Sequence, residues 1–155
     1  MGVLDAEAQA FFDDLDGVIE EAMVTKVRDA AAGYIQSAVI TEVYQKYPNP
    51  KYERKLDDHG LMDIHEAPQG SIESNYDSNT RTLTVENVRE DWEPTKRSHA
   101  GRNVAKVVES GNGYDWKQIG PRPFHKVAEE RLIQGKDVDF HIEDTFQKRM
   151  GAWSR

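Results

Sequence analysis

The chain has 155 residues, enough for one domain with extended arms, and its lack of cysteine excludes disulfides, thiol catalysis and cysteine-based zinc sites. Its hydrophobic fraction is 37% and its charged fraction 31%, so we expect a thin core or surfaces that partner chains complete. The formal net charge of −8 argues against a protein that grips duplex DNA, because Lys and Arg must neutralise the phosphates.

The N-terminal part of the sequence predicts a long amphipathic helix over residues 1–47. Steps of three and four relate its apolar residues: Phe11, Phe12, Leu15, Val18, Ile19, Ala22, Met23, Val27, Ala30, Ala31, Tyr34, Ile35, Ala38, Val39 and Val43. Gly17 and Gly33 weaken this helix, so we expect a bend or break at one of them. Its length leaves two interpretations open, a core helix or a helix that also packs against a neighbouring subunit.

The first residues are acidic rather than basic, which is not typical of a secretory signal. No apolar run reaches the roughly 18 residues that a membrane span requires. We therefore expect neither a signal peptide nor a contact with a membrane.

Residues 51–69 are polar and rich in turns. Histidines and carboxylates gather there: His59, His65, Asp57, Asp58, Asp63 and Glu66. Their spacing matches neither a His-Glu-x-x-His helix nor a calcium loop, so we assign no metal ligands. Five apolar residues should pack this segment onto the core: Tyr52, Leu56, Leu61, Met62 and Ile64.

Residues 70–89 predict a β-hairpin, because apolar and polar residues alternate on both sides of a Ser-Asn-Thr turn. One face of the hairpin should be buried and consist of Ile72, Tyr76, Leu83 and Val85. A lone hairpin is only marginally stable, so it must pack on the long helix, pair with a third strand or join a neighbour's sheet.

Residues 90–102 predict a polar loop whose second half has local positive charge from Lys96, Arg97 and Arg102. Such a loop could contact nucleic acid or a partner, or simply be mobile. The short apolar run 103–109 fits a strand as well as a helix.

The stretch from Tyr114 to Phe124 combines aromatic residues with Pro-Arg-Pro and leads into a predicted helix over 121–135. Pro123 suits the first position of that helix. The apolar stripe of this helix consists of Phe124, Val127, Ala128, Leu132 and Ile133. We interpret the stretch as a docking element that contacts a partner through Trp116, Arg122, Pro123 and Phe124. The alternative is that it joins a helix to the sheet within one chain.

A C-terminal arm over 138–155 contains an amphipathic segment from His141 to Met150, with Phe140 and Phe146 as apolar residues. Trp153 needs a pocket on this chain or on a partner. Together the elements predict an α+β fold in a single domain, 1–155. A long N-terminal helix packs on a small antiparallel sheet with a β-hairpin, and shorter helices follow.

Two short motifs have a familiar spacing, Val108-Glu109-Ser110-Gly111 and Arg122-Pro123-Phe124, followed by Val127 and Ala128. With the order of the other elements, they resemble the neck proteins of long-tailed phages and prophages, also called head–tail joining or tail-completion proteins. The basic loop and the segment beyond residue 137 depart from that layout.

The resemblance implies a structural protein rather than an enzyme, with no catalytic residue, cofactor or metal. Such proteins form rings of identical copies between capsid and tail, and contact neighbouring neck, connector or tail proteins. DNA passes through the lumen without sequence-specific binding. The expected location is the virion neck, after synthesis in the cytoplasm of the bacterial host.

Two other functions remain open from the residues alone. A small nucleic-acid-binding or regulatory module would use the basic loop 90–102. A metal-dependent hydrolase would use His59, His65 and the carboxylates near them, although no phosphate loop or nucleophile motif supports it.

Overall fold

The structure is a computed structural model that describes residues 3–46, 60–89, 103–111 and 120–151. Several residues singled out from the sequence lie outside these ranges: Tyr52, Leu56, Asp57, Asp58, His59, Trp116, Trp153 and the basic loop 90–102. Within the described ranges, each helix is too short or too polar to cross a membrane.

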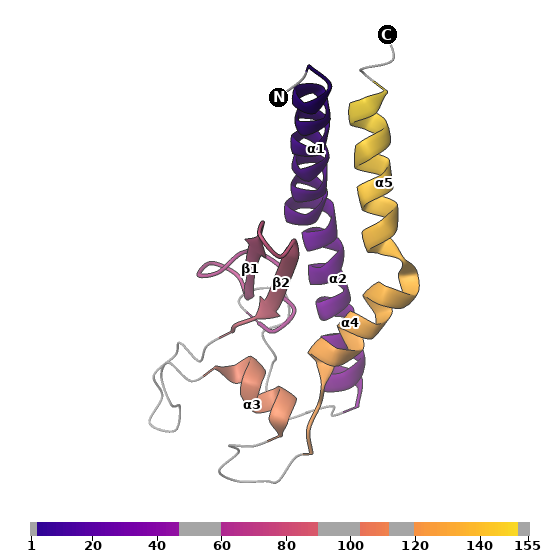
Figure 1. Ribbon diagram of the computed structural model, residues 1–155. Coiled ribbons are helices and arrows are strands. Elements are labelled where there is room, and N and C mark those ends of the chain that lie inside the picture. The colour runs from indigo at the N-terminus through magenta and orange to yellow at the C-terminus, as the bar shows by residue number, and fades with distance from the viewer. Residues whose placement is uncertain (1–2, 47–59, 90–102, 112–119, 152–155) are drawn as a thin grey trace.

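A long continuous helix comes first in the chain (Figure 1). It consists of α1 (Val3–Ala22), the π-helical turn η1 (Met23–Val27), α2 (Arg28–Ala38) and a second π-helical stretch, η2 (Val39–Gln45). A hairpin follows, with strands β1 (Ile72–Asp77) and β2 (Thr82–Asn87). The later helices are α3 (Val104–Ser110), α4 (Phe124–Gly135) and α5 (Asp137–Met150). The predicted α+β class is confirmed.

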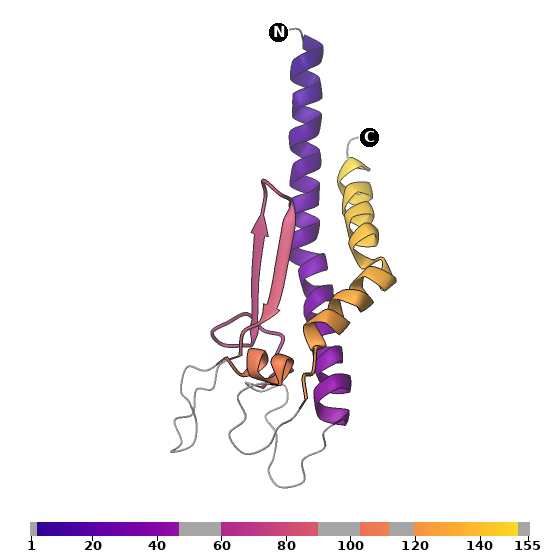
Figure 2. The same cartoon turned by 60° about the horizontal axis from the view of Figure 1, so that its bottom comes forward.

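The long helix lies between the other elements (Figures 1 and 2). The hairpin packs along one side of it, and α4 and α5 lie along the other side. α5 runs beside α1 in the opposite direction, so the two described ends of the chain lie at the same end of the molecule.

Of the bend or break predicted at Gly17 or Gly33, the break is wrong. Both glycines lie inside regular α-helix, and the irregular turns are η1 and η2 instead. A glycine costs a helix about 1 kcal/mol, whereas the buried side chains of Ala32 and Ile35 hold α2 in place beside Gly33. The packing of the helix therefore outweighs the weak local preference of glycine.

The strands of the hairpin are antiparallel, and Ile72 pairs with Asn87 and Tyr76 with Leu83. This register places Ile72, Tyr76, Leu83 and Val85 on one face, as predicted. Ile72 is fully buried there, and the other three side chains are half-buried. The face packs against the long helix.

The structure resolves one open assignment and corrects two predicted helix boundaries. The ambiguous run at 103–109 is helix α3, and α4 begins at Phe124, so Pro123 precedes its first turn rather than forming part of it. α5 begins at Asp137 rather than at His141. Two residues of the predicted apolar stripes, Ile133 and Phe140, are 67% and 62% exposed. Periodicity placed these residues on helices without showing which faces a neighbour covers.

The core lies where the hairpin, α3 and α4 meet the second half of the long helix. Its buried residues are Ala32, Ile35, Ala38, Val39, Val43, Leu61, Ile72, Ala105, Val108, Phe124 and Ala128. Met62 and Ile64 pack against this cluster, as predicted. By contrast, Phe11 and Phe12 near the start of α1 are 47% and 57% exposed.

Candidate functional site

Helix α3 is short and has a defined cap at each end. The Asn103 side chain accepts a hydrogen bond from the Lys106 amide at 2.9 Å and so starts the helix. Gly111 ends it with a φ of 69°, in the left-handed region that a residue without Cβ tolerates best, and its amide donates to the Val107 carbonyl. This turn explains the glycine of the motif Val108-Glu109-Ser110-Gly111.

The segment before α4 crosses the end of α3. The Arg122 amide donates to the Val108 and Glu109 carbonyls at 3.3 and 3.1 Å, and so satisfies carbonyls that a helix end leaves without partners. The Arg122 side chain is 6% exposed, and Phe124 is completely buried in the core. The second motif, Arg122-Pro123-Phe124, therefore holds α3 and α4 together.

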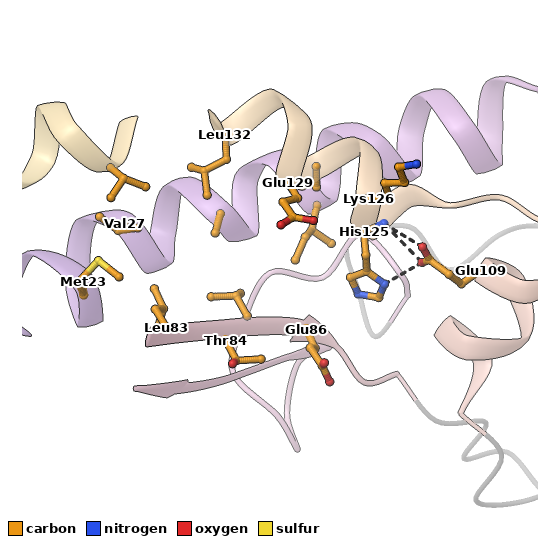
Figure 3. Close-up of a pocket in the computed structure, with 15 residues that line it drawn as sticks. Met23, Val27, Leu83, Thr84, Glu86, Glu109, His125, Lys126, Glu129 and Leu132 are labelled. Atoms are coloured by element: carbon orange, nitrogen blue, oxygen red, sulfur yellow. Dashed lines mark hydrogen bonds and ion pairs between the residues drawn. The ribbon is translucent and has the colours of Figure 1, made fainter. Parts of the chain in front are cut away.

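The Glu109 carboxylate lies at the N-terminus of α4. One of its oxygens, Oε2, lies 2.7 Å from Nδ1 of His125, and the His125 amide donates to both carboxylate oxygens at 3.3 and 3.4 Å (Figure 3). A negative charge is favourable at this position because the first amides of a helix carry partial positive charge. Glu109 thus caps α4 from a different helix.

His125 also contacts the hairpin. Its Nε2 accepts a hydrogen bond from the Asn87 amide at 2.9 Å, so this nitrogen carries no proton and Nδ1 donates to Glu109. Both ring nitrogens are engaged within the protein, which leaves neither of them available as a general base. The geometry assigns His125 a structural role.

Asn87 completes this cluster at the end of β2. Its side chain is buried, donates to the Leu61 carbonyl at 2.7 Å and accepts from the Arg89 amide at 3.2 Å. We refer to Asn87, Glu109, Arg122, Phe124 and His125 as the joint. It connects the hairpin, α3 and α4; Asn87, Arg122 and Phe124 are buried in it, and Glu109 and His125 are partly exposed.

A groove of about 560 Å³ adjoins the joint, between β2, the long helix and α4 (Figure 3). Its apolar lining consists of Met23, Val27, Ala31, Ile35, Leu83, Val85, Ala128, Leu132 and Val138. Its polar lining consists of Thr84, Glu86, Glu109, His125, Lys126 and Glu129. The groove therefore combines an apolar floor with a mainly acidic border.

The interface residues predicted from the sequence do not form one surface. Trp116 and Trp153 lie outside the described residues. Arg122 and Phe124 are buried within their own chain, whereas Pro123 between them is exposed. The alternative interpretation, a connection within one chain, accounts for Arg122 and Phe124, and their contact with a partner stays a prediction.

Three of the residues considered as metal ligands serve local contacts instead. Nδ1 of His65 lies 2.7 Å from Oδ1 of Asp63, and Glu66 pairs with Arg28 and accepts from Ser74 at 3.0 Å. Burial acts to raise the pKa of Glu66, but the hydrogen bonds from Arg28 and Ser74 outweigh it and lower that pKa. Across the residues that the structure describes, no group of three or more His, Cys, Asp or Glu side chains could hold a metal ion.

Sequence reasoning missed the contact of Asn87 with His125. Glu109 and Gly111 belong to a motif with a recognisable spacing, but no local pattern connects a strand end to a residue far along the chain. This contact depends on the tertiary arrangement alone.

The sequence matches the model of the YomN family over residues 10–148, which covers most of the chain. The chain therefore belongs to the YomN family. No curated protein and no solved structure shows a significant match.

Proposed function

We propose that this member of the YomN family is a structural protein of the phage or prophage neck, which joins the head to the tail or completes the tail. In this proposal its copies form a ring at the head–tail interface and contact neighbouring neck, connector or tail proteins. DNA passes through the lumen of the ring without sequence-specific binding.

The observation that carries the proposal is the shape and surface of the arm, our name for α1 with α5. α1 extends well beyond the hairpin (Figure 2), and Phe11 and Phe12 are about half-exposed on it. Large apolar side chains close together on an exposed helix are typical of a surface that a partner covers. A neighbouring subunit in a ring would provide that cover.

The joint supports the same proposal. The residues that carry the resemblance to neck proteins, Glu109, Gly111 and Phe124, have structural tasks: a helix cap, a left-handed turn and a core contact. His125 beside them has no nitrogen available for proton transfer. This chemistry suits a protein that holds its shape rather than one that reacts.

Charge is consistent with a ring around DNA. The exposed residues Asp5, Glu7 and Asp13 lie along the start of α1, and the whole chain carries a formal net charge of −8. Acidic surface repels phosphates, so DNA would slide past such a wall rather than bind to it.

The proposal is tested by deleting this gene from the parent phage or prophage and examining the lysate by electron microscopy. We expect heads and tails to accumulate separately, and a plasmid copy of the gene to restore joined particles. Normal, infectious particles without the gene would contradict the proposal.

A further inference from the structure

The hydrogen-bond pattern of the hairpin determines which main-chain groups face outward. The Val88 amide donates to the Ser71 carbonyl at 2.8 Å, which makes Ser71 and Val88 a hydrogen-bonded pair. Such pairs alternate along antiparallel strands, so Leu83, Val85 and Asn87 direct their N–H and C=O groups away from β1. These groups form the outer edge of β2.

The chain itself covers much of the opposite edge, on β1. The Ile72 amide donates to the His65 carbonyl at 3.0 Å, and the Ile72 carbonyl accepts from the Ala67 amide at 2.7 Å. The Ser74 amide donates to the Glu66 carboxylate at 3.0 Å. Edge strands are commonly protected in this way, since open edges invite pairing with other chains.

Within the described part of the chain, the outer edge of β2 has no comparable protection. Nε2 of His125 accepts a hydrogen bond from the Asn87 amide, so one end of the edge is already occupied. Among the described residues, no hydrogen bond reaches the main-chain groups of Leu83 or Val85 across this edge. Two residues therefore offer a pair of donors and a pair of acceptors side by side.

The groove lies next to this edge. The Leu83 side chain points toward Met23 and Val27 on the long helix, whereas the side chains of Thr84 and Glu86, which border the groove, lie on the opposite side of β2 (Figure 3). A strand alongside β2 would alternate in the same way. Every second side chain would enter the apolar groove, and the others would face solvent beside Thr84 and Glu86.

The solvent face of the hairpin is acidic where such a strand would lie. Glu73 and Glu86 are directly opposite each other in the register and are both exposed. Like charges in that position destabilise a hairpin, and neither carboxylate has an ion pair among the described residues. A lysine or arginine on an added strand would relieve this repulsion.

We propose that the outer edge of β2 accepts an extended segment of a partner protein as a third strand. The segment carries apolar side chains at alternate positions, which enter the groove, and Lys or Arg between them, beside Glu86, which lies opposite Glu73. Main-chain hydrogen bonds to Leu83 and Val85 hold it, and the contact of His125 with Asn87 sets where it ends. This binding site does not depend on the proposed role in the phage neck.

The test is amide hydrogen exchange of the ¹⁵N-labelled chain, followed by NMR, with the acetylated and amidated peptide Lys-Val-Lys-Val-Lys-Val as probe. We expect the peptide to slow exchange of the Leu83 and Val85 amides about tenfold, because new hydrogen bonds protect them. A peptide N-methylated at each valine, which lacks those main-chain donors, should give no protection. Unchanged exchange with the first peptide would overturn the proposal.

Two variants test the charge requirement. Glu73→Gln with Glu86→Gln should weaken binding of the probe about two- to fivefold, the usual effect of cross-strand ion pairs. The matched control, Glu7→Gln with Glu130→Gln, makes the same change in net charge away from the groove and should bind as the wild type does. Equal weakening by both pairs would contradict a basic partner at this edge. The Leu83 and Val85 amides could also become protected without peptide as the protein concentration rises. That result would overturn a partner protein as the occupant and assign the edge to a second copy of this chain.

Discussion

The joint and the arm are stabilised in different ways. The joint lies in the core, where Phe124 is fully buried and His125 makes hydrogen bonds with both ring nitrogens. The arm buries small residues, Val18 and Ala22, and leaves Phe11 and other large apolar side chains exposed. Close packing and the hydrogen bonds of Asn87, Glu109 and His125 therefore fix the fold at the joint, while the arm keeps apolar surface available.

Ion pairs join α5 to the long helix. Lys26 on η1 lies 2.5 Å from the Asp144 carboxylate on α5, and Lys148, one turn further along α5, lies 2.8 Å from the same carboxylate. Arg149 approaches Glu21 at 3.8 Å. Partly exposed pairs of this kind contribute little to stability, typically about 0–1 kcal/mol. These ion pairs therefore add little stability to the arm, and its exposed apolar side chains remain available to a partner.

The largest expected effect comes from Phe124→Ala in the joint. Truncating a buried phenylalanine leaves a cavity and should lower the free energy of unfolding by about 3–5 kcal/mol. Urea denaturation followed by circular dichroism measures the change. Phe140→Ala, at an exposed position on α5, is the control and should alter stability by less than about 0.5 kcal/mol. Similar losses in both variants would remove the distinction between joint and arm.

The second effect concerns the polar part of the joint. His125→Ala removes the acceptor for the Asn87 amide and the donor to Glu109, so stability should fall by about 1–3 kcal/mol. Lys126→Ala, the next residue on α4 and an exposed one, should change it little. If His125→Ala left the free energy of unfolding unchanged in the same denaturation assay, apolar packing alone would stabilise the joint.

Replacing two glycines by alanine should change the stability of the chain in opposite directions. Gly111→Ala places a side chain in the left-handed region and should cost about 1–2 kcal/mol. Gly33→Ala lies in regular helix, where an added Cβ meets nothing within 4 Å, and should stabilise the chain by about 0.5–1 kcal/mol. Thermal unfolding of both variants checks the signs, and a stabilising Gly111→Ala would contradict the cap that ends α3.

The smallest expected effect is a pH dependence of the arm. Hydrogen bonds from Lys148 and then Lys26 lower the pKa of Asp144 from its ordinary value of 3.8 to about 2. A carboxylate with a lowered pKa stabilises the fold above its ordinary pKa, and that contribution is lost as pH falls from about 4 to about 2. Asp144→Asn should therefore lose less stability than the wild type over this window. Parallel curves for the two proteins would show that Asp144 has no such role.

Local patterns predict much of the fold and little of the candidate site. Steps of three and four along the first helix, and alternation around Ile72 and Leu83, follow from the geometry of single elements, so both elements could be predicted. The groove and the contact of His125 with Asn87 could not, because they arise only when β2 and α4 lie beside the same helix. The exposure of Phe140 was missed for a related reason, since periodicity identifies an apolar face without showing whether anything covers it.

The most direct test of the central claim is the yield of infectious particles when a variant arm replaces the wild type. Phe11→Ser with Phe12→Ser should unfold at the same urea concentration as the wild type, because both side chains are already exposed. Supplied to a phage or prophage that lacks the gene, this variant should fail to restore infectious particles, although the protein is folded. Wild-type yields from the variant would contradict an arm that a partner must cover.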